Sequence, residues 1–321
     1  MASPNSTFTE MVTTTLRNHP TEVSDNVSKH NALYRYLQQG GRIKKISGGY
    51  EIVRPLEYAE NSTYQRYSGY DALNIGASEV FSAAKFDWVQ SAVHVTASGR
   101  ELRMNSGKEQ LIDLAASRTR NALKTASNNM SLDLYSDGSL SNQMGGLGKL
   151  ITTDGTGTVG GISTTGNTWW KNQFQEMSGA GTYADVKNDM IKLWLACVRG
   201  NDKPSLIVST NDLWAAYWNS LVPQQRYNDN TSTANAGFDS IKFQSANVIH
   251  DLETTNFTAT GETMFFINTD YLELVVHREA NWTTLDEKMS VNQDAVVIPV
   301  IWQGQLTVSN RALQGRLIDA S

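Results

Sequence analysis

The sequence predicts an α+β protein in which one body of helices and strands carries a long protruding β-hairpin. Alternating apolar residues at 50–58 and 80–96 flank a polar, tyrosine-rich segment, a pattern typical of two hairpin strands with a broad tip. Apolar residues then recur at helical spacing over 106–134 and 182–197. From residue 241 onward the pattern is that of short strands. This order of elements favours the α+β class.

The composition is that of a folded chain with a sizeable core. Of 321 residues, 40% are apolar and 18% are charged, enough for one large domain or two smaller ones. The formal net charge of -5 argues against a dedicated nucleic-acid binder, although DNA could be enclosed without being bound. The single cysteine, Cys197, excludes an intrachain disulfide. We expect no secretory signal, and the longest apolar run, 295–302, is far shorter than the ~18 residues of a membrane span.

The first hundred residues are expected to hold an arm, a short helix and the hairpin. Residues 1–23 are polar and predict an extended arm, and a short helix over 25–39 ends at Gly40 and Gly41. After Trp88 the strand alternation slips by one residue, which indicates a β-bulge. A two-stranded ribbon is only marginally stable in water, so the hairpin needs a partner surface. That surface is either the chain's own core or another molecule.

The remaining elements follow from capping and periodicity. Ser106 and Glu109 form a capping box that starts a helix running to about Leu134, a rod on the order of 40 Å long. Thr182 is expected to cap a second helix that ends near Cys197, and a third helix covers 211–221. The expected strands are 205–208, 241–243, 248–250, 264–268, 272–277, 295–302 and 306–309. Segment 296–302 is apolar on both faces, which predicts a fully buried strand.

Motifs that carry chemistry are incomplete. Gly155, Gly157 and Gly160 match the G-x-G-x-x-G spacing of a dinucleotide-binding loop, but the glycines and threonines that follow do not favour a helix. Cys197 lies on the apolar face of its predicted helix, where a thiol is normally inert. The five histidines show no metal-ligand spacing. We therefore expect no enzyme activity, no catalytic residue, no cofactor and no metal.

A series of segments carries a resemblance that spans nearly the whole chain. In order they are DNVSKHNALYRYLQQGGRI (25–43), GGYEIVRPLEYAENSTYQRYSGYD (48–71), NSGKEQLIDLAASRTRNAL (105–123), LYSDGS (134–139), GGLGKLI (145–151), TVGGI (158–162), WWKNQ (169–173), QQRYND (224–229), FDSIKFQSANVIHD (238–251), FFINTDYLELVVHRE (265–279) and IPVIWQGQLTVSNRALQG (298–315). Together they resemble the major capsid proteins of tailed bacteriophages, which have the Hong Kong 97-type fold.

The resemblance implies a structural role for each part of the chain. It implies an N-terminal arm over 1–41, an extended loop over 42–100, a peripheral domain with a long spine helix over 101–137, an axial domain over 138–265, and return strands of the peripheral domain with the C-terminus over 266–321. The implied function is self-assembly, through hexamers and pentamers, into an icosahedral head. That head would enclose a double-stranded DNA genome without sequence-specific binding and without a membrane.

The resemblance also implies partners and a location. Because the chain enters its arm at once, any scaffolding protein is expected to be a separate chain. A portal is expected, and a decoration protein is compatible with the fold. The protein would assemble in the host cytoplasm and reside in the capsid of the virion.

Residues of the extended loop are the candidates for contacts between subunits. In the resembling family this loop lies over a neighbouring subunit, which would supply the partner surface that the hairpin needs. The candidate contact residues are Arg54, Tyr58, Tyr64, Arg66, Tyr67, Tyr70, Lys85 and Trp88.

Two alternatives remain. An encapsulin-like nanocompartment shares the fold but houses an enzyme cargo, so the contents of purified particles distinguish it from a phage coat. The other is a nucleotide-dependent enzyme that uses the glycines at 155–160, which a thermal-shift screen with nucleotides would test.

Overall fold

The computed structural model describes residues 32–104, 114–178, 185–221, 240–251, 261–286, 288–289 and 293–319. The expected arm over 1–23, the capping box of Ser106 and Glu109, and the expected cap at Thr182 lie outside the described residues. The helices are α2 (Ala32–Gln39), α3 (Gly99–Met104), α4 (Leu114–Tyr135), α5 (Leu147–Leu150), α6 (Val186–Cys197) and α7 (Asn211–Leu221), with a short 3-10 helix at Thr168–Trp170. No helix among the described residues is long and apolar enough to cross a membrane.

The strands form two large sheets and two hairpins. They are β1 (Ile43–Ile46), β2 (Ile52–Glu57), β3 (Phe81–Phe86), β4 (Val89–Ser98), β5 (Thr158–Val159), β6 (Ile162–Ser163), β7 (Gln173–Glu176), β8 (Leu206–Ser209), β9 (Ser240–Phe243), β10 (Ala246–His250), β11 (Thr263–Ile267), β12 (Leu272–Thr284), β13 (Lys288–Met289), β14 (Ala295–Val308) and β15 (Gly315–Ile318). This mixture of helices and sheets confirms the expected α+β class.

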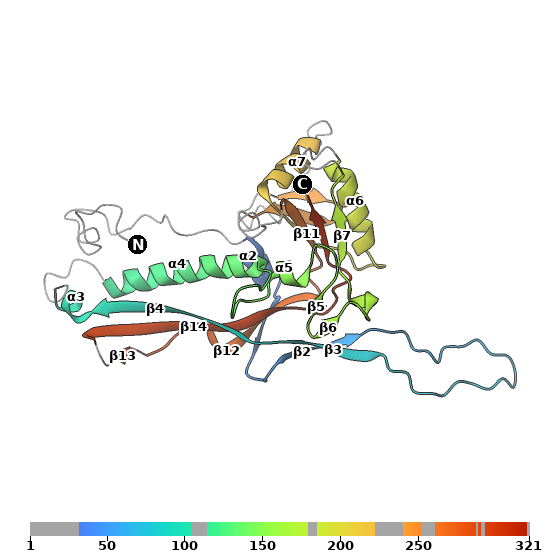
Figure 1. Ribbon diagram of the computed structural model, residues 1–321, viewed down its shortest axis with the longest axis horizontal. Coiled ribbons are helices and arrows are strands. Elements are labelled where there is room, and N and C mark those ends of the chain that lie inside the picture. The colour runs from blue at the N-terminus through green and yellow to red at the C-terminus, as the bar shows by residue number, and fades with distance from the viewer. Residues whose placement is uncertain are drawn as a thin grey trace.

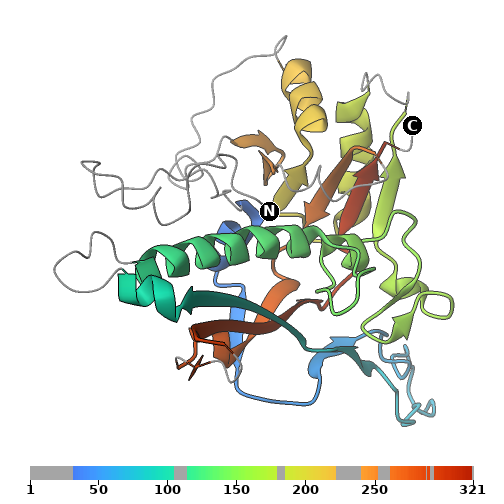
Figure 2. The same cartoon turned by 60° about the vertical axis from the view of Figure 1, so that its left-hand side comes forward.

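A long five-stranded sheet and helix α4 form the elongated part of the molecule. Strand β14 is central, with β4 antiparallel on one side and β12 and β13 antiparallel on the other, while β1 adds to β12 in parallel. Helix α4 lies along this sheet (Figure 1; Figure 2). Arg118 fixes it there, because its guanidinium donates to the Thr96 carbonyl of β4 at 2.8 Å and to both carboxylate oxygens of Glu101 at 3.1 Å.

A six-stranded sheet with two helices rises from one end of this elongated part (Figure 1). Its strand order is β7-β15-β11-β8-β10-β9. Along β11 the side chains alternate between two apolar layers: Met264 and Phe266 pack with α6 and α7, whereas Phe265 and Ile267 face the core shared with the rest of the body. This double burial is why β11 is apolar at four of its five positions.

The protruding hairpin is shorter than the sequence pattern predicted. β2 and β3 pair from Ile52 opposite Phe86 to Glu57 opposite Phe81. The slip after Trp88 is a break between two strands and not a bulge within one, because β4 leaves the hairpin and pairs with β14 over its whole length. The loop of residues 58–80 then extends well beyond the body (Figure 1).

Two predictions about the last strands were wrong. The strands predicted at 295–302 and 306–309 are one continuous strand, β14. Segment 296–302 is also not fully buried: Val300 and Trp302 are buried, but Val296, Val297 and Ile298 are only half-buried. Apolar side chains occur on both faces of this segment, but this chain alone does not bury all of them.

Candidate assembly surface

The base of the hairpin is fixed by a buried carboxylate. Glu273 of β12 pairs with Lys44 of β1, whose Nζ lies 2.8 Å from Glu273 Oε1, and with the guanidinium of Arg54 on β2. Only 8% of the Glu273 side chain is exposed. A buried carboxylate needs such partners, since an isolated buried charge is costly. The cluster ties β2 to the five-stranded sheet.

A glycine turn holds the other side of the hairpin base. Strands β5 and β6 are joined by Gly160 and Gly161, with φ angles of 61° and 75°. The backbone N–H of Lys85 on β3 donates to the Gly160 carbonyl at 2.9 Å. Tyr58 stacks on Trp169 with ring centroids 5.4 Å apart. Of the glycines in the G-x-G-x-x-G motif, Gly160 thus turns against the hairpin, whereas Gly155 lies near Asn172. A short strand follows the motif where a nucleotide loop would start a helix.

The junction between β3 and β4 is also anchored within the chain. Trp88 Nε1 donates to the Gly49 carbonyl at 2.9 Å, and the indole meets His277 edge-on at 5.9 Å. Lys85 Nζ lies 3.4 Å from a carboxylate oxygen of Glu51. All three contacts link the base of the hairpin to neighbouring segments of the same chain.

The tip of the hairpin has a different character. Tyr64, Tyr67 and Tyr70 are exposed, Tyr70 fully, and so are Leu73 and Ile75. Hydrogen bonds within the tip hold its two sides together, including Gln65 Nε2 to the Ala72 carbonyl at 2.9 Å and Ser62 Oγ to Ser78 Oγ at 3.2 Å. Large apolar side chains gathered on an exposed surface are typical of an interaction site.

The eight candidate contact residues therefore fall into two groups. Four make contacts within their own chain: Arg54, Tyr58, Lys85 and Trp88. The other four are exposed at the tip: Tyr64, Arg66, Tyr67 and Tyr70. Lys85 in the first group is exposed as well. The role of all eight residues in contacts between subunits stays a prediction.

A metal site and a reactive thiol are the two chemical features that the described residues can be checked for. They contain no cluster of three or more His, Cys, Asp or Glu side chains that could hold a metal ion. Cys197 is fully buried, and burial raises the pKa of its thiol to about 12, so the thiolate nucleophile is scarce.

Arg311 organises the junction of the two sheets and was missed from the sequence. Its buried guanidinium donates to the carbonyls of Leu150, Trp170 and Thr156 at 2.7, 3.4 and 3.1 Å and to Thr152 Oγ1 at 2.8 Å. Burial lowers its pKa to about 10. A single arginine in a polar stretch carries no sequence signal for such a role, because its acceptors are mostly backbone carbonyls more than 140 residues away.

Solved structures with the same architecture identify the fold. No family model and no curated protein matches the sequence. The capsid asymmetric unit of cyanophage A-1(L) matches with a TM-score of 0.68 at 14% identity, over 94% of this chain and 96% of that one. The capsid of an empty GTA particle matches with a TM-score of 0.62 at 12% identity, over 99% and 100% of the two chains. The chain has the Hong Kong 97-type capsid fold. The fold expected from the sequence resemblance is thereby confirmed.

A further neighbour with this capsid fold is the holo-SrpI encapsulin complex of Synechococcus elongatus. Its TM-score is lower, 0.52, at 8% identity over 94% of this chain and 92% of that one. All of these identities are low, so the likeness concerns the fold. The choice between the functions that proteins of this fold serve depends on further argument.

Proposed function

We propose that this chain is the major capsid protein of a tailed bacteriophage, a structural subunit with no enzymatic role. The observation that carries the proposal is the hairpin, whose base is fixed to its own body while its exposed tip projects beyond it (Figure 1). A projecting arm that docks on the next copy generates head-to-tail contacts, which close into rings when the rotation permits. Hexamers and pentamers of this kind would build a closed icosahedral shell.

Each part of the chain would have the structural role that the family resemblance implies. We propose residues 42–100 as the extended loop, 101–137 as the spine of the peripheral domain, 138–265 as the axial domain, and 266–321 as the strands that return to the peripheral domain. Residues 1–41 would form the arm. The proposal includes a separate scaffolding protein, a portal, assembly in the host cytoplasm, and a location in the virion.

The proposed content of the shell is double-stranded DNA, enclosed without sequence-specific contacts. The net charge of -5 supports enclosure over tight binding, since dedicated binders have basic domains. The encapsulin-like alternative is favoured by one weaker structural neighbour. Nucleic acid in purified particles supports the phage coat, whereas an enzyme cargo without nucleic acid supports the nanocompartment.

Deletion of the hairpin tip, residues 60–75, tests the assembly mechanism. This segment is polar and exposed apart from a few positions and contributes nothing to the buried core, so the body is expected to fold without it. Assembly is expected to fail because the tip makes its contacts on another copy. Circular dichroism reports folding and negative-stain microscopy reports shells. If the variant unfolds, or if it still forms normal shells, the role assigned to the hairpin is wrong.

The unmodified chain supplies the more general test. We expect closed shells when it is produced together with its scaffolding protein. A monodisperse 35.5 kDa monomer under every native condition, including that one, would count against the proposed function.

A further inference from the structure

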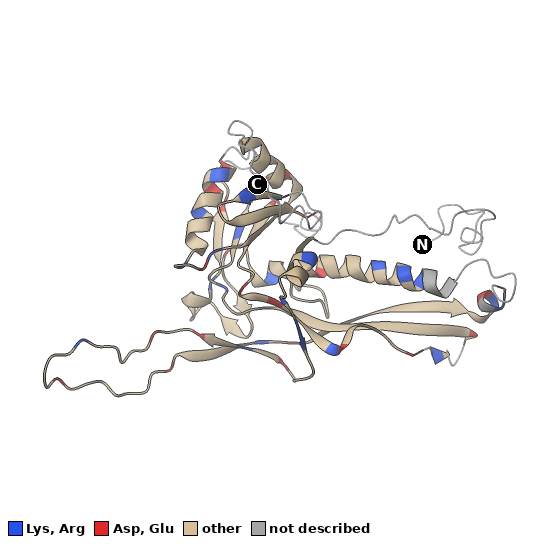
Figure 3. Cartoon of the chain, turned by 180° about the vertical axis from the view of Figure 1, so that it is seen from behind, with Lys and Arg blue, Asp and Glu red and all other residues tan. Residues whose placement is uncertain are grey.

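Buried basic side chains are rare in this chain. Arginine and lysine positions are distributed over the whole molecule, and among the described residues most of them are exposed (Figure 3). Only two basic side chains of the described residues are buried, Arg311 with no exposed surface and Arg316 with 6%. Burial of a cation is costly unless acceptors replace the water that it loses. The two arginines differ in how far this requirement is met.

Arg311 has an acceptor within the chain for each of its side-chain nitrogens. Nε donates to the Leu150 carbonyl at 2.7 Å, and Nη1 donates to the Trp170 carbonyl at 3.4 Å. Nη2 donates to Thr152 Oγ1 at 2.8 Å and to the Thr156 carbonyl at 3.1 Å. These acceptors replace the lost water, so Arg311 needs no ligand.

Arg316 of β15 has a single acceptor. Its Nε donates to Thr263 Oγ1 at 3.0 Å, and its guanidinium carbon lies 4.9 Å from the centre of the Phe265 ring. Among the described residues, no oxygen accepts a hydrogen bond from Nη1 or Nη2, and no carboxylate forms an ion pair with the guanidinium. An arginine has five N–H donors, so all but one of those of Arg316 lack a protein acceptor.

The free end of the Arg316 side chain can be reached from solvent. Neither of its Nη atoms is sealed inside the protein. Arg316 pairs in register with Phe174 of β7, the edge strand of the six-stranded sheet. Residues paired across two strands point to the same face, and Phe174 is 51% exposed. The face of the sheet that carries Arg316 is therefore open beside the edge strand.

A guanidinium whose two Nη groups are free is suited to one class of ligand. The N–H bonds at its end form a planar fork, which matches two oxygens of a phosphate or a carboxylate. Hydrogen bonds between such charged groups are about twice as strong as those between neutral ones. Burial lowers the pKa of Arg316 to about 10, so the guanidinium is still protonated at neutral pH and attracts an anion.

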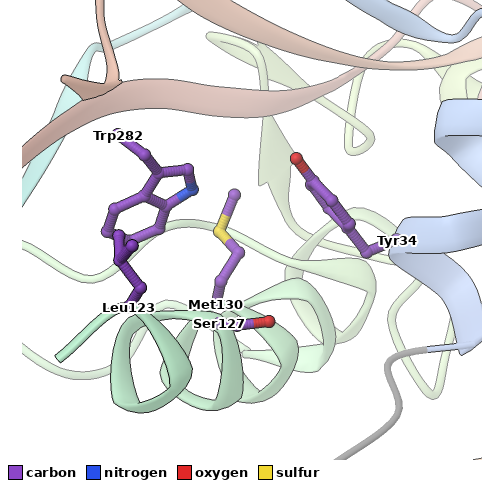
Figure 4. A pocket seen from close by; sticks show the side chains of 5 residues that line it. All are labelled: Tyr34, Leu123, Ser127, Met130 and Trp282. Atoms are coloured by element: carbon purple, nitrogen blue, oxygen red, sulfur yellow. The ribbon is translucent and has the colours of Figure 1, made fainter. Parts of the chain in front are cut away.

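The pocket between α4 and β12 has a different character. It has a volume of about 200 Å³ and is lined by Tyr34, Leu123, Ser127, Met130 and Trp282, none of which is charged (Figure 4). An anion in this pocket would lose hydration without gaining a charged partner. An oxyanion is therefore expected at Arg316 and not in the pocket.

We infer that Arg316 is the centre of a binding site for one small oxyanion, such as inorganic phosphate. Nη1 and Nη2 hold the oxyanion, while Nε stays bonded to Thr263. The bound oxyanion supplies the missing counter-charge beside β11 and β15, and it stabilises the folded chain because the unfolded chain does not bind it. The inference goes beyond the proposed function, since the site needs neither a second copy nor a genome.

Thermal unfolding with phosphate added at constant ionic strength tests the site. Phosphate at about 100 times its Kd is expected to raise the Tm of the unmodified chain by about 3–5 °C, and Arg316→Met is expected to lose this shift. Phosphate also stabilises proteins in general, because it is excluded from their surface. The matched control is therefore Arg278→Met, at an exposed position of β12, which is expected to respond like the unmodified chain. An equal shift in all three proteins is a general salt effect and overturns the inference.

Stability without phosphate separates an external oxyanion from an acceptor in the chain itself. Arg316→Met removes an unpaired buried charge, so in a buffer without oxyanions it is expected to be at least as stable as the unmodified chain. Arg316→Gln repeats the comparison with a neutral side chain that can still donate to Thr263. If both variants are clearly less stable than the unmodified chain, a group of the chain, such as the carboxylate of Glu262 or Asp319, already satisfies Arg316 and the inference is wrong.

Equilibrium dialysis with radiolabelled phosphate measures binding directly. We expect a single bound phosphate per chain for the unmodified protein and for Arg278→Met, and no bound phosphate for Arg316→Met. An unmodified chain that binds no phosphate overturns the inference, whether or not it assembles. Failure of the proposed function looks different, since the chain then forms no shells although it still binds phosphate.

Discussion

The turn at Gly160 offers a controlled test of how the hairpin is held. A Cβ atom at position 160 would lie 2.8 Å from the Cβ of Ala84 and 3.2 Å from a ring carbon of Phe86, both on β3. At position 161 an added Cβ would meet nothing within 4 Å. Both glycines have a positive φ, so alanine is strained at either position. The two substitutions therefore share the backbone cost and differ only in the contact with the hairpin.

The expected losses of folding stability follow from the backbone strain and from the contact with the hairpin. Alanine in the left-handed region costs about 1–2 kcal/mol, which is the whole expected effect of Gly161→Ala. Gly160→Ala adds an overpacking cost of about 1–3 kcal/mol, because the Cβ of Ala84 belongs to a backbone that must move. The shift would also strain the hydrogen bond from the Lys85 N–H to the Gly160 carbonyl. We expect Gly160→Ala to destabilise the chain by about 2–5 kcal/mol in total.

Urea unfolding of the two variants measures the difference, and limited proteolysis of the hairpin locates it. Gly160→Ala is expected to be cleaved faster within residues 58–80 than Gly161→Ala. Assembly should also suffer more, because the arm no longer leaves the body at its proper angle. Equal stability and equal cleavage in the two variants would refute the view that this turn holds the hairpin.

Three further predictions concern the body and the mature shell. Trp194→Ala should cost about 3–5 kcal/mol in urea unfolding, because the buried indole packs edge-on against the core of the six-stranded sheet and leaves a cavity; a loss below 1 kcal/mol would contradict the assigned core. Hydrogen bonds from Arg118 lower the pKa of Glu101 from 4.5 to about 2, so their stabilisation is complete above pH 4.5 and is lost as the pH falls towards 2. Glu101→Gln should therefore weaken the acid dependence of unfolding between pH 5 and pH 2. An unchanged dependence of stability on pH would contradict the role of the Glu101 carboxylate. Covalent links between subunits are not expected, since such a link needs a lysine buried beside a carboxylate and Lys44, Lys45 and Lys85 are exposed. A ladder of bands from mature particles on a denaturing gel would contradict this.

Elements in which the apolar residues recur at one regular spacing were predicted well from the sequence. The helix expected at 211–221 is α7 with the same limits, and the strand expected at 264–268 is β11 with a shift of one residue. Both have apolar side chains that meet a core formed by the chain itself. The local sequence pattern and the tertiary environment agree there, so the pattern alone is sufficient to locate the element.

The errors came from residues whose role depends on distant partners. Two strands were predicted at 295–302 and 306–309, but β14 continues through Gln303 and Gly304 between them. Gly304 is small because an added Cβ would lie 2.6 Å from the Trp302 ring and from the Val275 carbonyl, a contact that the local pattern does not reveal. In the same way, the slip after Trp88 predicted a bulge within one strand, whereas β4 is a separate strand that joins a different sheet.

The candidate contact residues show a similar limit, and it has a consequence for assembly. The sequence located the hairpin but could not separate its anchored base from its exposed tip, since both are rich in aromatic and charged residues. The base contacts of Arg54, Tyr58 and Trp88 hold the arm before any second copy arrives. An arm that is already ordered loses less conformational entropy on docking, and so more of the contact energy at the tip appears as affinity. Substitutions at the base should therefore weaken assembly by loosening the arm within its own chain.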